Sequence, residues 1–151
     1  MPVESQSLKQ SRTYTQDEAF DASLAYFTGD DLAARVWINK YALKDSQGNL
    51  FERTPNDMHR RIAKEIARVE LRYPNPLSEE TIFDLIKDFK YIVPQGSPMA
   101  GIGNPYQIAS LSNCFVIGNE GESDSYGGIL KIDQEQVQLM KRRGGVGHDL
   151  S

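Results

Sequence analysis

The sequence has 151 residues, 39% hydrophobic and 25% charged, a composition typical of a globular domain with a hydrophobic core. Its net charge of −4 and its interspersed acids and bases argue against binding to a nucleic acid polymer, which requires a basic face. No apolar run reaches the ~18 residues of a membrane span, and the first residues lack the apolar core of a secretory signal. The single cysteine excludes an internal disulfide framework and favours a reducing, cytoplasmic location.

The first part of the chain has a helical pattern. Residues 1–13 are polar and are predicted to form a disordered tail, and residues 14–93 are predicted to form a helical subdomain. Apolar residues at helical spacing, together with capping residues and breakers, predict four helices in this subdomain. Their expected starts are Thr15, Asp31, Thr54–Pro55 and Ser78, and the fourth helix is expected to end near Phe89.

The pattern changes in residues 94–151, which are predicted to be a second part of the chain that does not form a complete domain by itself. Pro94–Pro105 contains three prolines and three glycines, so neither a helix nor a central strand is expected there. The nearly continuous apolar run within Ser110–Ile117 predicts a buried strand, covered on both faces. A polar loop is expected at residues 119–123.

A last helix is predicted for Asp124–Arg143, ending before Gly144. We expect Gly127 and Gly128 to break it into two parts, with Asp133 capping the second. The glycine-rich segment Arg143–Gly147 is expected to be a tight turn leading toward another strand.

Each residue that could carry chemistry also has an ordinary structural explanation. A lone cysteine in an apolar run, such as Cys114, is most often a small buried hydrophobe, whereas reactivity requires exposure or a redox partner. Arg143–Gly147 is either a helix stop or a place where backbone approaches a ligand. Asp124–Ser125 either caps a helix or binds a sugar or phosphate. His59 and His148 are expected to be ordinary polar residues, and no metal site is predicted.

Four motifs in order resemble those of ribonucleotide reductase catalytic chains, most closely the adenosylcobalamin-dependent class. The motifs are Ser97–Gly101, Ser110–Val116, Asp124–Ile129 and Arg143–Gly147. The helical stretch Glu52–Ala63 is also similar, and the resemblance covers residues 14–151. It implies a mainly α chain, in which a helical N-terminal subdomain precedes the first strands and helices of a ten-stranded α/β barrel. His148 and the insertion at residues 119–123 depart from the family pattern.

The resemblance also implies roles for individual residues. Cys114 is the expected redox-active cysteine of the first barrel strand, which helps reduce the ribose and then forms a disulfide with a cysteine on a distant strand. The residues expected to contact the ribonucleotide substrate are Ser97, Asn113, Cys114 and Gly145. Those expected to start the helix that binds the deoxynucleotide specificity effector are Asp124, Ser125 and Tyr126.

For the whole enzyme, the resemblance implies radical reduction of ribonucleotides to deoxyribonucleotides. The radical source is adenosylcobalamin, not bound by this chain alone, or alternatively a diiron small subunit. The family's radical cysteine, the partner of Cys114 and the catalytic Asn and Glu are not in the sequence. We therefore expect the chain to be inert without the rest of the barrel, supplied by a split chain or a missing C-terminal part. The alternative is a non-catalytic helical module that binds a nucleotide or a protein, with Cys114 merely buried.

Overall fold

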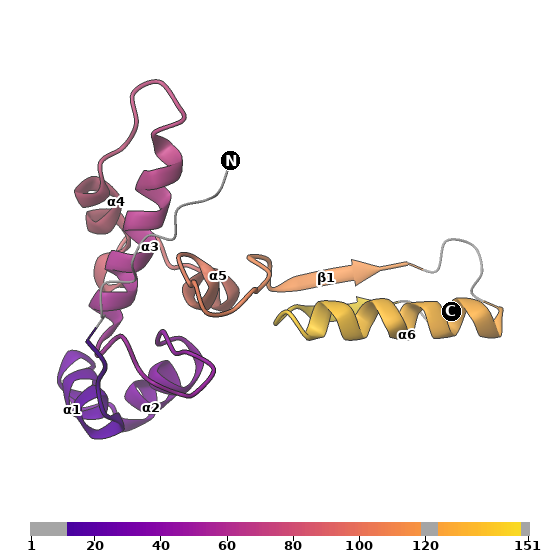
Figure 1. The fold of residues 1–151 in the computed structure, drawn as a ribbon, viewed down its shortest axis with the longest axis horizontal. Coiled ribbons are helices and arrows are strands. Elements are labelled where there is room, and N and C mark those ends of the chain that lie inside the picture. Colours follow the sequence, from indigo (N-terminus) through magenta and orange to yellow (C-terminus); the bar gives the residue numbers. More distant parts are fainter. Residues whose placement is uncertain (1–11, 119–123, 149–151) are drawn as a thin grey trace, which may run out of the picture.

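The computed structural model describes residues 12–118 and 124–148. The described residues form a helical body from which a narrow arm projects (Figure 1). The body contains α1 (Gln16–Tyr26), α2 (Asp31–Lys40), α3 (Pro55–Glu70), α4 (Glu79–Ile86), the 3₁₀ helix η1 (Lys87–Phe89) and α5 (Gly96–Gly101). The arm contains β1 (Cys114–Ile117), α6 (Tyr126–Met140) and β2 (Gly145–His148). The predicted mainly α fold is confirmed, whereas the ten-stranded barrel stays a prediction.

Local capping explains where the first four helices begin, and all four were predicted. The side chains of Thr15, Asp30 and Ser78 each accept a hydrogen bond from a backbone N–H in the first turn of the following helix. Pro55 occupies the first turn of α3, where its missing N–H costs no helical hydrogen bond. The expected tail at residues 1–13 lies mostly outside the described residues, and the expected loop at 119–123 lies entirely outside them.

The hydrophobic core lies between α1, α2, α3 and α4. Its largest members are Trp37, Ile38, Leu50, Met58, Ile62, Ile82, Phe83 and Ile86, each at most 8% exposed. Burying one side chain of this size stabilises the folded state by roughly 1.5–3 kcal/mol. Met99 and Ile102 pack against the edge of this core, so the segment around α5 is anchored to the helical body.

The prediction that Pro94–Pro105 is irregular was wrong in part, because it contains α5. Pro98 is the third residue of that helix, where a backbone N–H would have no helical acceptor in any case. At the other end, Arg61 of α3 donates a hydrogen bond from Nη2 to the carbonyl oxygen of Met99 at 2.9 Å. A contact from another element therefore satisfies one of the last carbonyls of the helix.

The arm is a parallel β–α–β unit. Cys114 pairs with Gly145 and Ile117 pairs with His148, and α6 makes the crossover that parallel strands require. Phe115 and Ile117 are half-buried, whereas Cys114 and Val116 on the opposite face are exposed, Val116 to 90%. The prediction of a buried strand over Ser110–Ile117 was therefore wrong, because α6 covers only one face and the strand begins at Cys114.

The predicted break in the last helix was also wrong. α6 is continuous from Tyr126 to Met140. Gly127 and Gly128 lie in its first turn, where the N–H of Gly128 donates to Ser125 Oγ at 2.9 Å, and Asp133 lies mid-helix rather than at a cap. The helix ends before Arg143, whose φ of 69° makes the turn into β2, so the predicted glycine turn is largely strand.

Candidate functional site

A cleft lies where the arm joins the helical body. It has a volume of about 360 Å³ and is lined by Asn39, Lys40, Tyr41, Gly96, Ser97, Asn113, Cys114 and Arg143. Three residues predicted to contact substrate, Ser97, Asn113 and Cys114, thus line the same cleft. Gly145 is paired with Cys114, and a Cβ placed on it would lie 3.9 Å from Cys114 Sγ. All four predicted substrate-binding residues are therefore brought together.

Asn113 connects the segments that form the cleft. Its Oδ1 accepts a hydrogen bond from the N–H of Ser97 at 2.7 Å, and its backbone carbonyl accepts one from the N–H of Gly145 at 2.6 Å. Ser97, which is only 6% exposed, also donates from Oγ to the carbonyl of Arg143 at 3.4 Å. These bonds fix α5, β1 and β2 relative to one another at the cleft.

Cys114 is exposed, on the face of the sheet opposite α6. The interpretation of Cys114 as a small buried hydrophobe was therefore wrong, and so was the buried thiol assumed in the alternative of a non-catalytic module. Because the sequence has one cysteine, a disulfide at this thiol requires a second thiol from outside these 151 residues.

Three lining residues of the cleft come from the end of α2 and were not predicted: Asn39, Lys40 and Tyr41. The ring of Tyr41 lies so close to Gly96 that a Cβ there would be 3.2 Å from Cε1. Arg143 was singled out only as the start of the glycine-rich segment, and no role was predicted for its side chain, whose Nη1 donates to the carbonyl of Lys40 at 3.3 Å. Nothing in the local sequence indicates these contacts, since each joins residues that are far apart in the chain, 103 positions in the case of Arg143 and Lys40.

The residues predicted to bind the effector lie at the N-terminal end of α6, far from the cleft (Figure 1). The helix has 15 residues, so it separates them from its cleft-side end by roughly 20 Å. Ser125 is the N-cap, Asp124 is exposed, and Tyr126 is 81% exposed. The structure therefore groups Asp124, Ser125 and Tyr126 with one another but not with Cys114.

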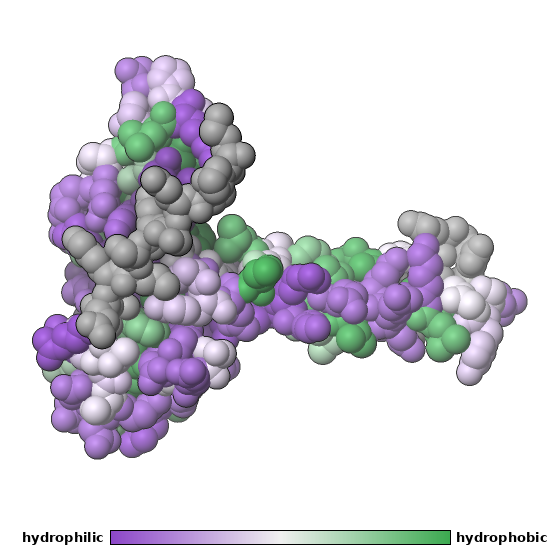
Figure 2. Space-filling model, in the orientation of Figure 1, coloured by the Kyte–Doolittle hydropathy of each residue, from purple (hydrophilic) through white to green (hydrophobic). Residues whose placement is uncertain are grey.

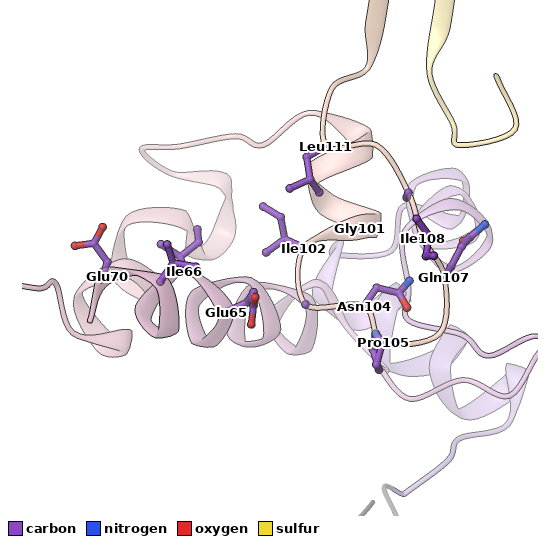
Figure 3. Close-up of a pocket in the computed structure, with 13 residues that line it drawn as sticks. Glu65, Ile66, Glu70, Gly101, Ile102, Asn104, Pro105, Gln107, Ile108 and Leu111 are labelled. Atoms are coloured by element: carbon purple, nitrogen blue, oxygen red, sulfur yellow. The ribbon is translucent and has the colours of Figure 1, made fainter. Parts of the chain in front are cut away.

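A second, larger groove of about 670 Å³ runs between α3 and residues 101–111 (Figure 3). Its walls include Ile66, Ile102, Ile108 and Leu111, with Ile108 85% exposed. None of the predicted site residues lines it.

The two histidines have different surroundings. His59 was predicted to be an ordinary polar residue, but it is fully buried in the core, and neither ring nitrogen has a hydrogen-bond partner among the described residues. Burial lowers its pKa to about 4, although the charge of Asp88 opposes that shift. His148 lies in β2. Among residues 12–118 and 124–148, no three His, Cys, Asp or Glu side chains are grouped to hold a metal ion.

Comparisons with known proteins identify a family. Residues 27–105, just over half of the chain, match the family described as "Ribonucleotide reductase, all-alpha domain". The matched range runs from the end of α1 past α5, and therefore includes Ser97 and the end of α2 but not Cys114. No match was found among curated proteins or among solved structures. Within the described residues, no helix is long and apolar enough to cross a membrane.

Proposed function

Because this chain belongs to the ribonucleotide reductase family and contains the all-alpha domain of its large subunit, we propose that it supplies one of the redox-active thiols and part of the substrate site of such an enzyme. The reaction is the reduction of a ribonucleotide to a deoxyribonucleotide. The observation that carries the proposal is that Ser97, Asn113 and Cys114 line one cleft and that Gly145 pairs with Cys114 beside it. The family assignment rests on the matched region, and the proposed substrate site rests on the position of these four residues.

The proposed chemistry is a two-electron reduction at the ribose. The 2′-hydroxyl leaves as water, a hydrogen replaces it, and two thiols are oxidised to a disulfide. Cys114 provides one thiol, and its exposed position beside the backbone of Gly145 gives a ribose room to approach. Asn113 and Ser97 orient the substrate, because their hydrogen bonds hold them in place at the mouth of the cleft.

We place the radical source outside this chain. Among the described residues, no three His, Cys, Asp or Glu side chains lie close enough together to hold a metal ion, so these residues do not fit a diiron centre. We propose no residue of the cleft as a ligand of adenosylcobalamin. Adenosylcobalamin and a diiron small subunit both stay proposals for the whole enzyme. The step assigned to this chain is only the transfer of hydrogen from Cys114 Sγ.

We propose that the partner of the arm is the rest of a catalytic barrel, on a separate chain or on a continuation of this one. Among the described residues, β1 and β2 pair only with each other, so each has an open edge. Their outer face, with Cys114 and Val116, is uncovered. Parallel strands are normally covered on both faces, which supports completion by further strands and a lack of activity without them.

The test is reconstitution with the remaining barrel, followed by Cys114→Ser. The variant should lose multi-turnover formation of deoxyribonucleotide, because the hydroxyl cannot form the disulfide. Ser112→Ala is the matched control, since Ser112 is exposed two residues away and does not line the cleft. Disulfides mapped after one turnover should include Cys114. Full multi-turnover activity in Cys114→Ser would refute the assignment.

The start of α6 is proposed to bind the deoxynucleotide effector. Asp124 is exposed and Ser125 makes the capping bond, so Asp124→Ala removes a carboxylate while that bond to Gly128 is retained. In the reconstituted enzyme, Asp124→Ala should reduce the change in substrate preference that deoxynucleotides cause. Asp133→Ala, an exposed carboxylate in the middle of α6, is the control. An effector response equal to that of the control would contradict the role of Asp124.

A further inference from the structure

The cleft beside Cys114 is electropositive. Two of its eight lining residues, Lys40 and Arg143, are cationic and none is acidic. A third cation, Lys44, donates from Nζ to the carbonyl of Asn39, which is itself a lining residue, at 3.3 Å. Burial lowers the pKa of Lys44, and the nearby positive charge of Arg143 lowers it further. Two cations therefore line the cleft, and a third contacts one of its lining residues.

Within the described part of the chain, no carboxylate forms an ion pair with these cations. The ion pairs among residues 12–118 and 124–148 join Asp31 to Arg35, Glu52 to Arg61, Glu80 to Arg60, Glu65 to Arg68 and Asp84 to Lys87. None of them includes Lys40, Lys44 or Arg143. Arg143 and Lys44 repel each other, and a bound anion would relieve that repulsion. Their gathering is notable in a chain whose net charge is −4.

The geometry of Arg143 suits a phosphate group. Its backbone is held at two points, because its carbonyl accepts a hydrogen bond from Ser97 Oγ and because Gly145, two residues later, pairs with Cys114. Its Nη1 donates to the carbonyl of Lys40, which fixes the guanidinium at the end of α2 and leaves its other N–H groups available. A guanidinium in a fixed position binds a phosphate through paired, charge-assisted hydrogen bonds.

We propose that Arg143 and Lys40 bind the phosphate group of the nucleotide substrate, and that the end of α2 is a wall of the substrate site. This inference rests on the proposed function and extends it to residues of the helical body. A cleft of about 360 Å³ is within the range that holds small ligands. The phosphate lies at the cationic side, and the ribose reaches the thiol of Cys114. Tyr41, packed against Gly96, closes the wall between them.

The test compares Arg143→Gln with Arg142→Gln in the reductase reconstituted with its barrel. Arg142 is the adjacent cation, is exposed and does not line the cleft, so both variants lose the same charge. Arg143→Gln should raise the KM for the ribonucleotide roughly tenfold to a hundredfold, with a smaller change in kcat. Lys40→Gln should act in the same direction, and Arg143→Lys should recover part of the loss. Arg142→Gln should leave KM unchanged. Equal KM values in Arg143→Gln and Arg142→Gln would overturn the inference and leave the proposed function standing.

If the reconstituted wild type forms no deoxyribonucleotide, the proposed function is refuted. A binding measurement then still tests the anion site by itself. Inorganic pyrophosphate is titrated into the wild type and both variants, and circular dichroism confirms that each is folded. Binding by the wild type and by Arg142→Gln, with loss in Arg143→Gln, would support an anion site at this cleft. Absence of binding, or equal binding in all three proteins, would overturn it.

Discussion

The guanidinium of Arg61 lies 2.7 Å from the carboxylate of Glu52, and both side chains are at most 9% exposed. Arg61 also donates to the carbonyls of Met99 and Ile102 at the end of α5, and Glu52 accepts from the N–H of Leu43 after α2. One buried ion pair therefore connects α3 to both helices that supply the walls of the cleft. Burial raises the pKa of the Glu52 carboxyl, and the charge of Arg61 opposes that shift.

Removing one member of this pair should be strongly destabilising. Arg61→Met leaves a buried carboxylate without its partner, and we expect a loss of about 3–5 kcal/mol in the free energy of unfolding. Denaturant unfolding of the variant measures it. Arg68→Met is the control, since Arg68 pairs with Glu65 at the surface and should cost at most about 1 kcal/mol. The double variant Glu52→Gln/Arg61→Met should recover part of the loss. A single-variant cost equal to that of the control would show that the pair is not a structural connection.

His59 should make the stability of the helical body depend on pH. Its pKa is about 4 in the folded chain and 6.5 as an ordinary value, so the unfolded chain binds more protons in between. Stability is therefore complete above the unfolded value and is lost as the pH falls toward the folded value. We expect a loss of about 2 kcal/mol between about pH 7 and about pH 5. His59→Leu should remove this dependence and His148→Gln should retain it. The same pH slope in His59→Leu as in the wild type would contradict the prediction.

Gly144 should be required for the packing of the arm. A Cβ at this position would lie 2.7 Å from Cε2 of Phe115 and 3.2 Å from the carbonyl oxygen of Leu139. Gly144→Ala must displace one of them, and overpacking of this kind costs about 1–3 kcal/mol. Gly147→Ala is the control, because nothing lies within 4 Å of a Cβ there. In the protein reconstituted with its barrel, hydrogen exchange at β1 and β2 should accelerate in Gly144→Ala only. Similar exchange in both variants would mean that Phe115 adjusts without cost.

Sequence reasoning succeeded where the causes of structure are local. The start of α3 was predictable from Thr54–Pro55, and its buried face from the spacing of Met58 and Ile62, because caps and apolar periodicity act within a few residues. It failed where another element decides the outcome. Arg61 donates a hydrogen bond to the carbonyl of Met99 near the end of α5, and no pattern in residues 94–105 predicts that contact.

The candidate site follows the same division. The family resemblance identified Ser97, Asn113, Cys114 and Gly145, which the structure brings to one place. The exposure of Cys114 was not predictable from the apolar run that contains it. Such a run forms a strand that is buried on one face or on both, and this depends on which other elements cover the strand. Tyr41 and a role for the side chain of Arg143 were not predicted, because only the folded chain brings the end of α2 to the turn before β2.

The stability of the arm should depend on a partner. Apolar side chains are exposed along it, and hydrophobic surface is visible there in Figure 2. They are Val116, Ile129, Leu130, Val137 and Met140, each at least 44% exposed. A two-stranded sheet is marginal by itself, and open edges with an uncovered face leave its amides accessible to water. The helical body has a buried core of its own and should not share this weakness.

Hydrogen exchange on the dilute chain should therefore separate the two parts. We expect slow amides in the helices between Ala33 and Leu85 and fast amides from Asn113 to Ile117. Adding the barrel that we propose as partner should slow the second set and leave the first unchanged. A dilution series is the control, because self-association through the open edges would protect the strand only at higher concentration. Strong protection of Asn113–Ile117 at every dilution would mean that the arm is stable alone. The structural argument for a completing barrel would then be lost, because strands whose amides are already protected do not require further strands.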